Sequence, residues 1–129
     1  MRGEQILVTQ RTAQQPMPLK WEFPGGKIEP GETPEEALRR ELHEELAVRV
    51  EVGKIYEVLA HSYPSFDLLM LVYPCRLVGE GNPELREVAD MAWVKPLEMR
   101  AFDILEADAP LVERLIEEGV AAPGFPAGV

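Results

Sequence analysis

The sequence predicts an α/β protein, a sandwich in which a mixed β-sheet lies between helices. The first observation behind this prediction is the order of patterns along the chain: strands, a helix, further strands and a last helix. The second is length, because 129 residues can enclose one core and are too few for two domains. We therefore expect a single domain over residues 1–120.

The chain opens with strand patterns. Residues 4–9 alternate in polarity, with Ile6 and Val8 on one face. A polar, proline-containing loop over residues 11–20 leads to a short strand at residues 21–23. Pro24, Gly25, Gly26 and Lys27 follow and indicate a turn, because glycine adopts backbone angles that other residues resist.

The next segment has the clearest helical pattern. Thr33 suits the N-cap, Pro34 suits the first helical position, and Glu36 stands where a capping box needs a glutamate. Apolar residues then repeat every four positions, at Leu38, Leu42 and Leu46. We therefore expect an amphipathic helix that begins after Thr33.

The second half of the chain predicts three more strand segments and one helix. Residues 48–59 form a strand interrupted at Gly53, residues 67–78 form a strand buried on both faces, and residues 88–94 form a short strand. A helix covers residues 109–118 and ends at Gly119, with four buried residues: Leu111, Val112, Leu115 and Ile116. Residues 121–129 lack periodicity and predict a disordered tail.

Composition restricts the possible partners. The net charge of −10 argues against nucleic-acid polymers and anionic membranes, because both attract basic surfaces. The longest apolar run, residues 68–73, is too short to span a bilayer, and no signal-peptide pattern opens the chain. The single cysteine, Cys75, forms no intrachain disulfide and is expected to pack in the core. These features predict a cytoplasmic protein.

An acidic enzyme that acts on phosphorylated small molecules needs a bridging cation and hence clustered carboxylates. Glu41, Glu44 and Glu45 provide a cluster, because positions i, i+3 and i+4 share one helix stripe. Viewed down the helix axis with Leu38 at zero, the three carboxylates centre about 70° to one side and the three leucines about 40° to the other. The carboxylates therefore border the buried face. The alternative is a solvated acidic face, with Arg39 and Arg40 paired to neighbouring glutamates.

The spacing around this helix resembles the Nudix signature. That signature is a glycine, five residues, a glutamate, seven residues, and then Arg-Glu-aliphatic-any-Glu-Glu-any-Gly-aliphatic. The matching residues here are Gly26, Glu32, Arg40, Glu41, Leu42, Glu44, Glu45 and Val48. Ala47 departs from the pattern, since the family usually has glycine there to end the helix in a left-handed conformation. Alanine costs about 1 kcal/mol in that conformation.

The resemblance implies a Nudix-type α/β/α sandwich and a divalent metal site. It makes Glu41, Glu44, Glu45 and the Gly26 carbonyl the ligands of Mg²⁺, with Mn²⁺ as an alternative. One helix glutamate, for which we choose Glu41, would deprotonate the attacking water. The resemblance also implies two supporting residues, since Arg40 would orient the carboxylates and Glu32 would hold the loop.

The flanking residues resemble the MutT-like branch of the family, which hydrolyses nucleoside triphosphates. The run from Trp21 to Lys27 is close to that branch's entry into the signature. Arg11 matches an arginine that contacts phosphate there, and Lys27 lies beside the same loop. Either residue can equally be a surface charge. Glu87 matches a loop glutamate that approaches the metal, and Glu84 and Asp90 are alternatives to it.

Asp108 matches a residue that contacts the base in this branch. A carboxylate only accepts hydrogen bonds, so it would favour bases with amino groups, as in cytosine and guanine. Asp108 is equally suited to be the N-cap of the last helix. Tyr63 and Phe66 are candidates to stack on a base, although packing is the commoner role of such residues.

The resemblance implies a pyrophosphohydrolase that converts a nucleoside triphosphate, of oxidised guanine or of cytidine, to the monophosphate and pyrophosphate. Alternatives are a Nudix hydrolase of ADP-ribose or a dinucleoside polyphosphate, and a nucleotide-binding Nudix domain without catalysis. The protein would be a monomer or a homodimer. MutT-like proteins usually have another strand before the segment at residues 4–9, and this sequence has no room for it, so we expect either that the sequence starts too late or that the sheet is completed differently.

Overall fold

The computed structural model describes residues 5–79 and 81–119. The predicted tail at residues 121–129 lies outside these residues. The strands are β1 (Ile6–Gln10), β2 (Trp21–Glu22), β3 (Val50–Val52), β4 (Glu57–Tyr63), β5 (Phe66–Val72), β6 (Cys75–Leu77) and β7 (Asp90–Val94). The helices are α1 (Pro34–Leu46) and α2 (Ala109–Glu118), with 3₁₀ turns η1 (Pro96–Ala101) and η2 (Glu106–Asp108).

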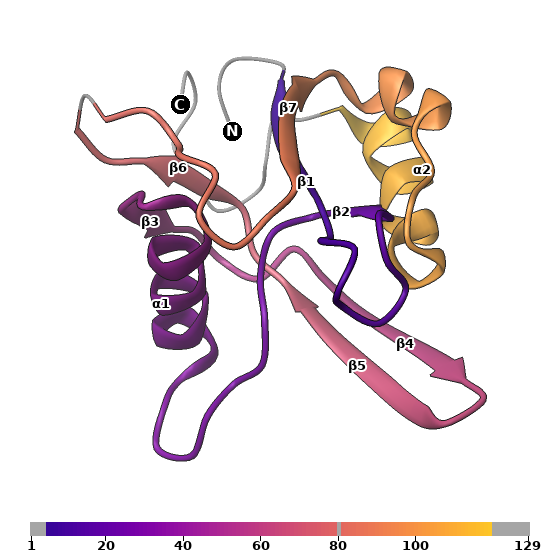
Figure 1. The fold of residues 1–129 in the computed structure, drawn as a ribbon, viewed down its shortest axis with the longest axis horizontal. Coiled ribbons are helices and arrows are strands. Elements are labelled where there is room, and N and C mark those ends of the chain that lie inside the picture. Colours follow the sequence, from indigo (N-terminus) through magenta and orange to yellow (C-terminus); the bar gives the residue numbers. More distant parts are fainter. Residues whose placement is uncertain (1–4, 80, 120–129) are drawn as a thin grey trace.

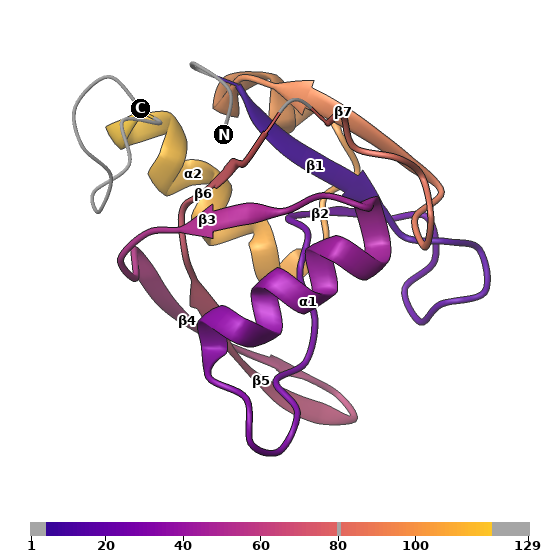
Figure 2. The ribbon, with the colours of Figure 1, turned by 90° about the vertical axis from the view of Figure 1, so that its left-hand side faces the viewer.

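The two α-helices lie on opposite sides of the strands (Figure 1), and the view from the side shows α1 in front of the strands and α2 behind them (Figure 2). This arrangement confirms the α/β fold class. The strands form three sheets, ordered β2-β1-β7, β3-β6 and β4-β5, and every pair among them is antiparallel. Within the described residues, parallel pairing is confined to one isolated bridge between Trp21 and Ile104.

The core has two parts, one on each side of β1. Ile6 and Val8 point to the side of α2, where they pack with buried residues that include Met99 and Val112. Leu7 points to the other side, against α1 and its buried leucines. Because side chains alternate along a strand, β1 supplies apolar residues to both helix layers, which holds them together.

Both ends of α1 are satisfied by hydrogen bonds. At the start, the Glu36 amide donates to Thr33 Oγ1 at 3.1 Å and the Thr33 amide donates to Glu36 Oε1 at 3.3 Å, which confirms the predicted capping box. At the end, Ala47 adopts the predicted left-handed conformation, with φ 56°. α2 also has the predicted bounds and ends at Gly119.

The prediction of one strand over residues 67–78, buried on both faces, is wrong. The chain breaks between β5 and β6 at Pro74, which has no amide hydrogen for a ladder. β5 pairs with β4 alone, and its outer face is uncovered, so Leu69 is 66% exposed. The segment at residues 48–59 is likewise divided into β3 and the start of β4, which reaches Tyr63.

Two further predictions concern burial and membranes. Cys75 lies in β6 against the α1 side of the core, and burial raises the pKa of its thiol to about 11. The thiol is therefore protonated at neutral pH, as expected of a packing residue. Neither helix in the described parts of the chain has the length and apolar composition needed to cross a bilayer.

Candidate metal and nucleotide site

The acidic stripe of α1 borders the buried face of the helix, as its spacing predicts. Leu42 and Leu46 are buried, whereas the side chain of Glu41 is 17% exposed and that of Glu44 is 47% exposed. Glu45 is partly buried. The three carboxylates thus run from the solvent to the edge of the core.

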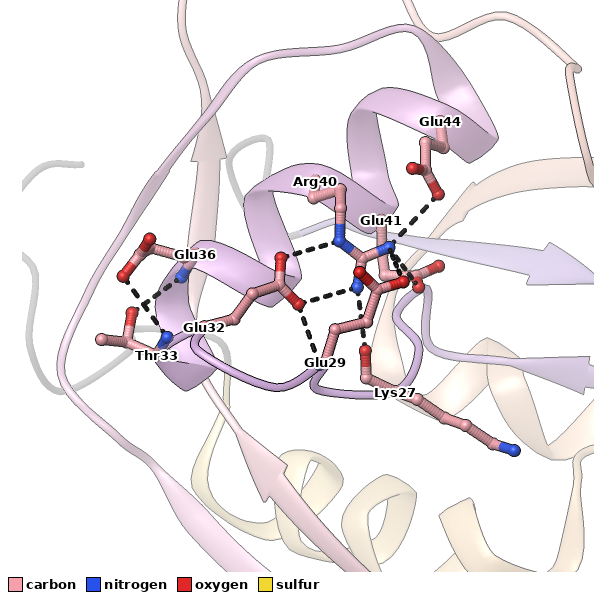
Figure 3. Close-up of polar contacts among 8 residues, drawn as sticks. All are labelled: Lys27, Glu29, Glu32, Thr33, Glu36, Arg40, Glu41 and Glu44. Atoms are coloured by element: carbon pink, nitrogen blue, oxygen red, sulfur yellow. Dashed lines mark hydrogen bonds and ion pairs between the residues drawn. The ribbon is translucent and has the colours of Figure 1, made fainter.

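Arg40 joins this stripe to the preceding loop (Figure 3). Its Nε and Nη2 donate to the two carboxylate oxygens of Glu32 at 2.8 and 3.0 Å, and Nη2 also donates to the Lys27 carbonyl at 2.9 Å. Its Nη1 donates to Glu41 at 2.9 Å and to Glu44 at 3.3 Å. The fork geometry of guanidinium suits such multiple contacts. One arginine therefore fixes the loop and orients two carboxylates of the helix.

Glu45 lies in a different environment from Glu44. The pKa of its carboxyl is raised to about 8, chiefly by burial and also by the negative charges of Glu41, Glu22 and Glu87, while a hydrogen bond from the Gly25 amide opposes the shift. A carboxylate that is desolvated among like charges is stabilised by a nearby cation. Glu45 is therefore the side chain of the stripe whose surroundings most favour a cation.

Gly26 lies against the stripe. A Cβ added to Gly26 would lie 2.6 Å or less from the carboxyl carbon and both oxygens of Glu41. Such distances exclude any side chain unless Glu41 moves. The predicted partners Gly26 and Glu41 are therefore neighbours, and a side chain at position 26 would displace the Glu41 carboxyl.

The loop after residue 83 brings Glu87 to the same end of α1. The amides of Arg86 and Glu87 donate to the Glu45 carbonyl at 3.1 and 3.2 Å, so this loop occupies the free carbonyls of the helix end. The charge of Glu87 acts on Glu45. Of the two alternatives, Glu84 pairs with Arg86 at the surface and Asp90 accepts from the Met91 amide. Of the three carboxylates, Glu87 is the one whose charge acts on Glu45.

These carboxylates are neighbours, but they do not form a closed set of ligands. Among the described residues, no three His, Cys, Asp or Glu side chains are spaced to hold a metal ion. Glu41 and Glu44 accept hydrogen bonds from Arg40, and Glu45 accepts one from Gly25. The chemistry of the donors, all oxygens, nevertheless fits Mg²⁺ or Mn²⁺.

An apolar cavity of about 750 Å³ adjoins the acidic stripe. Side chains of β1, β5, β6, α1 and α2 line most of it. Its polar lining includes Arg11, Glu22 and Asp108, and Gly25 and Gly26 also line it. The cavity thus combines an apolar lining with the charged side chains of Arg11, Glu22 and Asp108. It lies beside Gly25 and Gly26, which contact the carboxylate stripe.

Arg11 and Lys27, the predicted phosphate contacts, differ in placement. Arg11 Nη1 pairs with the Glu22 carboxylate at 2.9 and 3.3 Å, and its Nε donates to the Pro16 carbonyl at 2.8 Å. The ammonium of Lys27 extends away from the carboxylates in Figure 3, whereas its carbonyl binds Arg40. Arg11 is thus held in the cavity, and Lys27 contributes its main chain to the cluster.

Asp108 precedes α2, but its side chain makes no hydrogen bond to the helix start, so the N-cap interpretation is wrong. Its carboxylate instead accepts from the amide of Phe23, the residue after β2, at 2.9 Å. Asp108 is 4% exposed, and burial raises its pKa to about 7. Asp108 thus lies buried at the wall of the cavity.

Tyr63 and Phe66 both line the cavity, with ring centroids 5.1 Å apart. The Tyr63 hydroxyl accepts from the Ala107 amide at 3.1 Å, so it also supports the turn before Asp108. Sequence reasoning assigned no role to Glu22, and a signal was present: a carboxylate between Trp21 and Phe23 in an apolar strand. The Phe23 amide has no signature in sequence, because every residue except proline carries one.

Comparisons with known proteins agree over most of the chain. The profile of the NUDIX domain matches residues 1–115. The 8-oxo-dGTP diphosphatase of Haemophilus influenzae is 39% identical over 116 residues, 88% of this chain and 83% of the relative. The CTP pyrophosphohydrolase of Escherichia coli is 32% identical over 123 residues, 95% of this chain and 90% of the relative. The solution structure of the E. coli ORF135 protein matches with a TM-score of 0.74 at 30% identity, covering 90% of this chain and 82% of that one.

Proposed function

The chain belongs to the Nudix hydrolase family, and we propose that it is a divalent-metal-dependent pyrophosphohydrolase that converts a nucleoside triphosphate to the monophosphate and pyrophosphate. The observation that carries the proposal is the position of Glu45. Its carboxyl is buried within reach of Glu41 and Glu87, next to a cavity that holds Arg11 and Asp108. The end at Glu45 suits a metal ion bound to phosphate, and the end at Asp108 suits a nucleobase.

Enzymes of this family generally need a divalent metal, and here we assign Mg²⁺, with Mn²⁺ as an alternative. Glu41, Glu44, Glu45 and Glu87 would hold it, together with the Gly26 carbonyl. The bound cation supplies a lower pKa for the attacking water and neutralises charge on the departing phosphate. Arg40 keeps Glu41 and Glu44 on the metal side, since it binds both carboxylates and the Glu32 loop at once.

The chain's own residues would divide the remaining work along the cavity. Glu41 would accept the proton of the attacking water, as it lies at the edge of the core beside Gly26. Arg11 would bind the phosphates, with Lys27 as a second, more exposed contact. A guanidinium suits this role because its planar donors match phosphate oxygens in pairs.

At the base end, the Phe23 amide and the Asp108 carboxylate form a donor and an acceptor 2.9 Å apart. A base that inserts between them must offer an acceptor beside a donor. Cytosine does so with N3 and its 4-amino group, and 8-oxoguanine does so with O6 and its N7 hydrogen. Both bases therefore stay in the proposal, as substrates of the same reaction.

The test is a release assay with Mg²⁺ or Mn²⁺ on CTP, dCTP, GTP and 8-oxo-dGTP. We expect pyrophosphate and a monophosphate from at least one of them. Release of inorganic phosphate and a diphosphate would contradict the proposed bond cleavage. No turnover of any nucleotide by the folded protein would contradict the proposal as a whole.

Two variants test the assignment of the metal ligands. Glu44→Gln and Glu45→Gln should each lower kcat by at least about a hundredfold, because a neutral amide binds divalent cations far less well than a carboxylate. Glu117→Gln removes an exposed carboxylate on α2 and is the matched control, with activity unchanged. If Glu45→Gln retained near-parental turnover at saturating metal, the assignment of Glu45 would be wrong.

Asp108→Ala tests whether Asp108 recognises the base of the nucleotide. Loss of the carboxylate should lower kcat/KM for the preferred nucleotide by about tenfold to a thousandfold relative to the other nucleotides. A variant that lost stability but kept the parental order of preference would show that Asp108 has a structural role alone.

A further inference from the structure

The segment that leads into α2 is hydrogen-bonded to two distant strands. On one side, the Leu105 amide donates to the Trp21 carbonyl of β2 at 2.8 Å. On the other side, the Ala107 amide donates to the Tyr63 hydroxyl of β4 at 3.1 Å. Both contacts fix the backbone immediately before Asp108, whose carboxylate lies at the proposed base end of the cavity.

The Ala107 amide depends on Tyr63 for its partner. It belongs to the start of a helical segment, where backbone donors have no acceptor within the helix. Neither Leu105 before η2 nor Asp108 before α2 caps these donors with its side chain. Ala107 is 1% exposed, so water has little access to it, and a buried donor without a partner is unfavourable. The Tyr63 hydroxyl therefore supplies an acceptor that the local sequence lacks.

The Tyr63 ring is itself fixed by two aromatic neighbours. Phe66 is its cross-strand partner in β5, with ring centroids 5.1 Å apart, and His61 of β4 packs edge-on at 4.5 Å. His61 Nε2 also lies 3.7 Å from the carboxylate of Glu106 in η2, next to the same turn. Such packing of a ring with few torsions keeps its hydroxyl in one place.

A displacement at Ala107 would pass directly to Asp108. The Asp108 carboxylate meets the Phe23 amide at 2.9 Å, and together they form the proposed donor and acceptor for the base. Hydrogen bonds weaken steeply as distance and angle depart from the optimum, so the choice between bases is sensitive to this position. Among the described residues, Tyr63 makes no hydrogen bond to the acidic stripe of α1. A change at Tyr63 should therefore alter base selectivity and spare the reaction centre.

We propose that Tyr63 is a positioning residue that sets the base selectivity of the cavity, because its hydroxyl holds the Ala107 amide and thereby fixes where the Asp108 carboxylate meets the base. This inference rests on the proposed function for the role of Asp108. It makes a residue of the β4-β5 hairpin act on the base through the turn before α2.

Hydrogen–deuterium exchange followed by NMR tests the contact in the nucleotide-free protein. The Ala107 amide of the parent should exchange at least about a hundredfold more slowly than in an unstructured chain, and Tyr63→Phe should speed its exchange about tenfold. An Ala107 amide that exchanges in the parent at the unstructured rate overturns the inference. The measurement on the parent decides this point even if the variant does not fold.

The kinetic test compares nucleotides. Tyr63→Phe removes the hydroxyl and keeps the ring. The ratio of kcat/KM between the best and the poorest of CTP, dCTP, GTP and 8-oxo-dGTP should fall about threefold to tenfold, through a higher KM for the best nucleotide. kcat should stay within about twofold of the parent. A ratio that keeps its parental value overturns the inference, whatever happens to kcat.

Asp108→Asn tests whether Tyr63 acts through Asp108. Adding Tyr63→Phe to this variant should change the ratio by less than about twofold, because both substitutions act on the same contact. Additive effects overturn the inference, since Tyr63 would then act on the base independently of Asp108.

Tyr56→Phe is the matched control. The Tyr56 hydroxyl donates to the carboxylate of Glu118 in the last turn of α2, so the variant removes a bond between the same two parts of the fold at a place remote in sequence from Asp108. The ratio should be unchanged. An equal fall of the ratio in the Tyr56 and Tyr63 variants overturns the inference, because loss of any bond to α2 would then suffice.

The same selectivity can be measured without turnover, by isothermal titration calorimetry with CMP, dCMP, GMP and 8-oxo-dGMP. Binding without hydrolysis of the triphosphates contradicts the proposed function and leaves the inference to be decided by the ratio of dissociation constants in parent and variant. A parent protein that neither binds nor hydrolyses any of these nucleotides contradicts both.

Discussion

Asp108 and Glu45 are single residues whose burial alters their acid–base chemistry. Aspartate and glutamate side chains in water ionise near pH 4, whereas burial raises the pKa of Asp108 to about 7 and that of Glu45 to about 8. Near neutral pH, each is close to the point at which it gains or loses its proton. A proton, a cation or a polar ligand would therefore change the local charge at either end of the cavity.

Asp108→Asn tests this at the level of one side chain. In the unfolded chain Asp108 ionises near its model value of 3.8, and in the folded protein it ionises near 7. Between these values the folded state binds more protons, so the aspartate lowers the free energy of unfolding as the pH rises. The asparagine can still accept from the Phe23 amide. We expect the free energy of unfolding of the variant to exceed that of the parent by about 1–3 kcal/mol between pH 4 and pH 7.5.

The measurement is urea unfolding of parent and variant at a series of pH values. The difference in free energy of unfolding should grow from pH 4 to about pH 7 and then level off. A difference that stays constant with pH, or that shrinks as the pH rises, would show that the Asp108 carboxyl is not desolvated in the folded protein.

At the scale of elements, the loop before α1 is joined to the helix by close contact. The structure brings the Gly26 backbone against the Glu41 carboxyl, and Arg40 ties the same loop to Glu32. The helix and loop thus form one unit in which a small displacement of either shifts the carboxylates.

Gly26→Ala tests this contact. The added Cβ would displace the Glu41 carboxyl, and since a misplacement of about 1 Å costs on the order of a hundredfold in rate, we expect kcat to fall by about that factor. Gly81→Ala is the matched control, because nothing lies within 4 Å of the added Cβ. Circular dichroism should show both variants folded. Equal activity of the two variants would contradict the close approach at Gly26.

At the C-terminal end of α1, replacement of one residue should stabilise the protein. Ala47 has φ 56°, a left-handed conformation in which alanine is strained and glycine is not. Ala47→Gly should raise the free energy of unfolding by about 0.5–1 kcal/mol, which corresponds to roughly 2–5 °C in Tm. Differential scanning calorimetry measures this shift, with activity as parent. A lower Tm would show that the entropy of the unfolded glycine outweighs the relief of strain.

At the scale of the whole molecule, the strands separate two apolar clusters, and each helix covers one of them. Leu46 is fully buried in the cluster under α1, one residue after Glu45. The same packing that stabilises the fold therefore sets the depth of the carboxylates.

Leu46→Ala should lower the free energy of unfolding by about 2–5 kcal/mol, because it removes a fully buried side chain and leaves a cavity. Leu97→Ala truncates a leucine that is 61% exposed and should cost less than about 0.5 kcal/mol. Urea titration of both variants gives the comparison. Similar losses for the two would mean that the cluster under α1 contributes little to stability.

The sequence by itself determined the features that depend on neighbours along the chain. Thr33 and Glu36 cap α1, and Glu41, Glu44 and Glu45 share a stripe beside the buried leucines, because residues three or four apart meet on a helix. The left-handed Ala47 follows from its place after the last turn. Each of these features rests on local geometry, which a sequence spacing fully specifies.

The tertiary structure alone decided the features that join distant segments. It divided residues 67–78 at Pro74, since burial of a strand depends on which elements cover it. In the folded protein Asp108 does not cap the helix but accepts a hydrogen bond from Phe23, 85 residues away, at the cavity wall. The fold also places the charge of Glu87 near Glu45. Such contacts depend on long-range packing, in which an acid can bind any amide or cation that the fold places beside it.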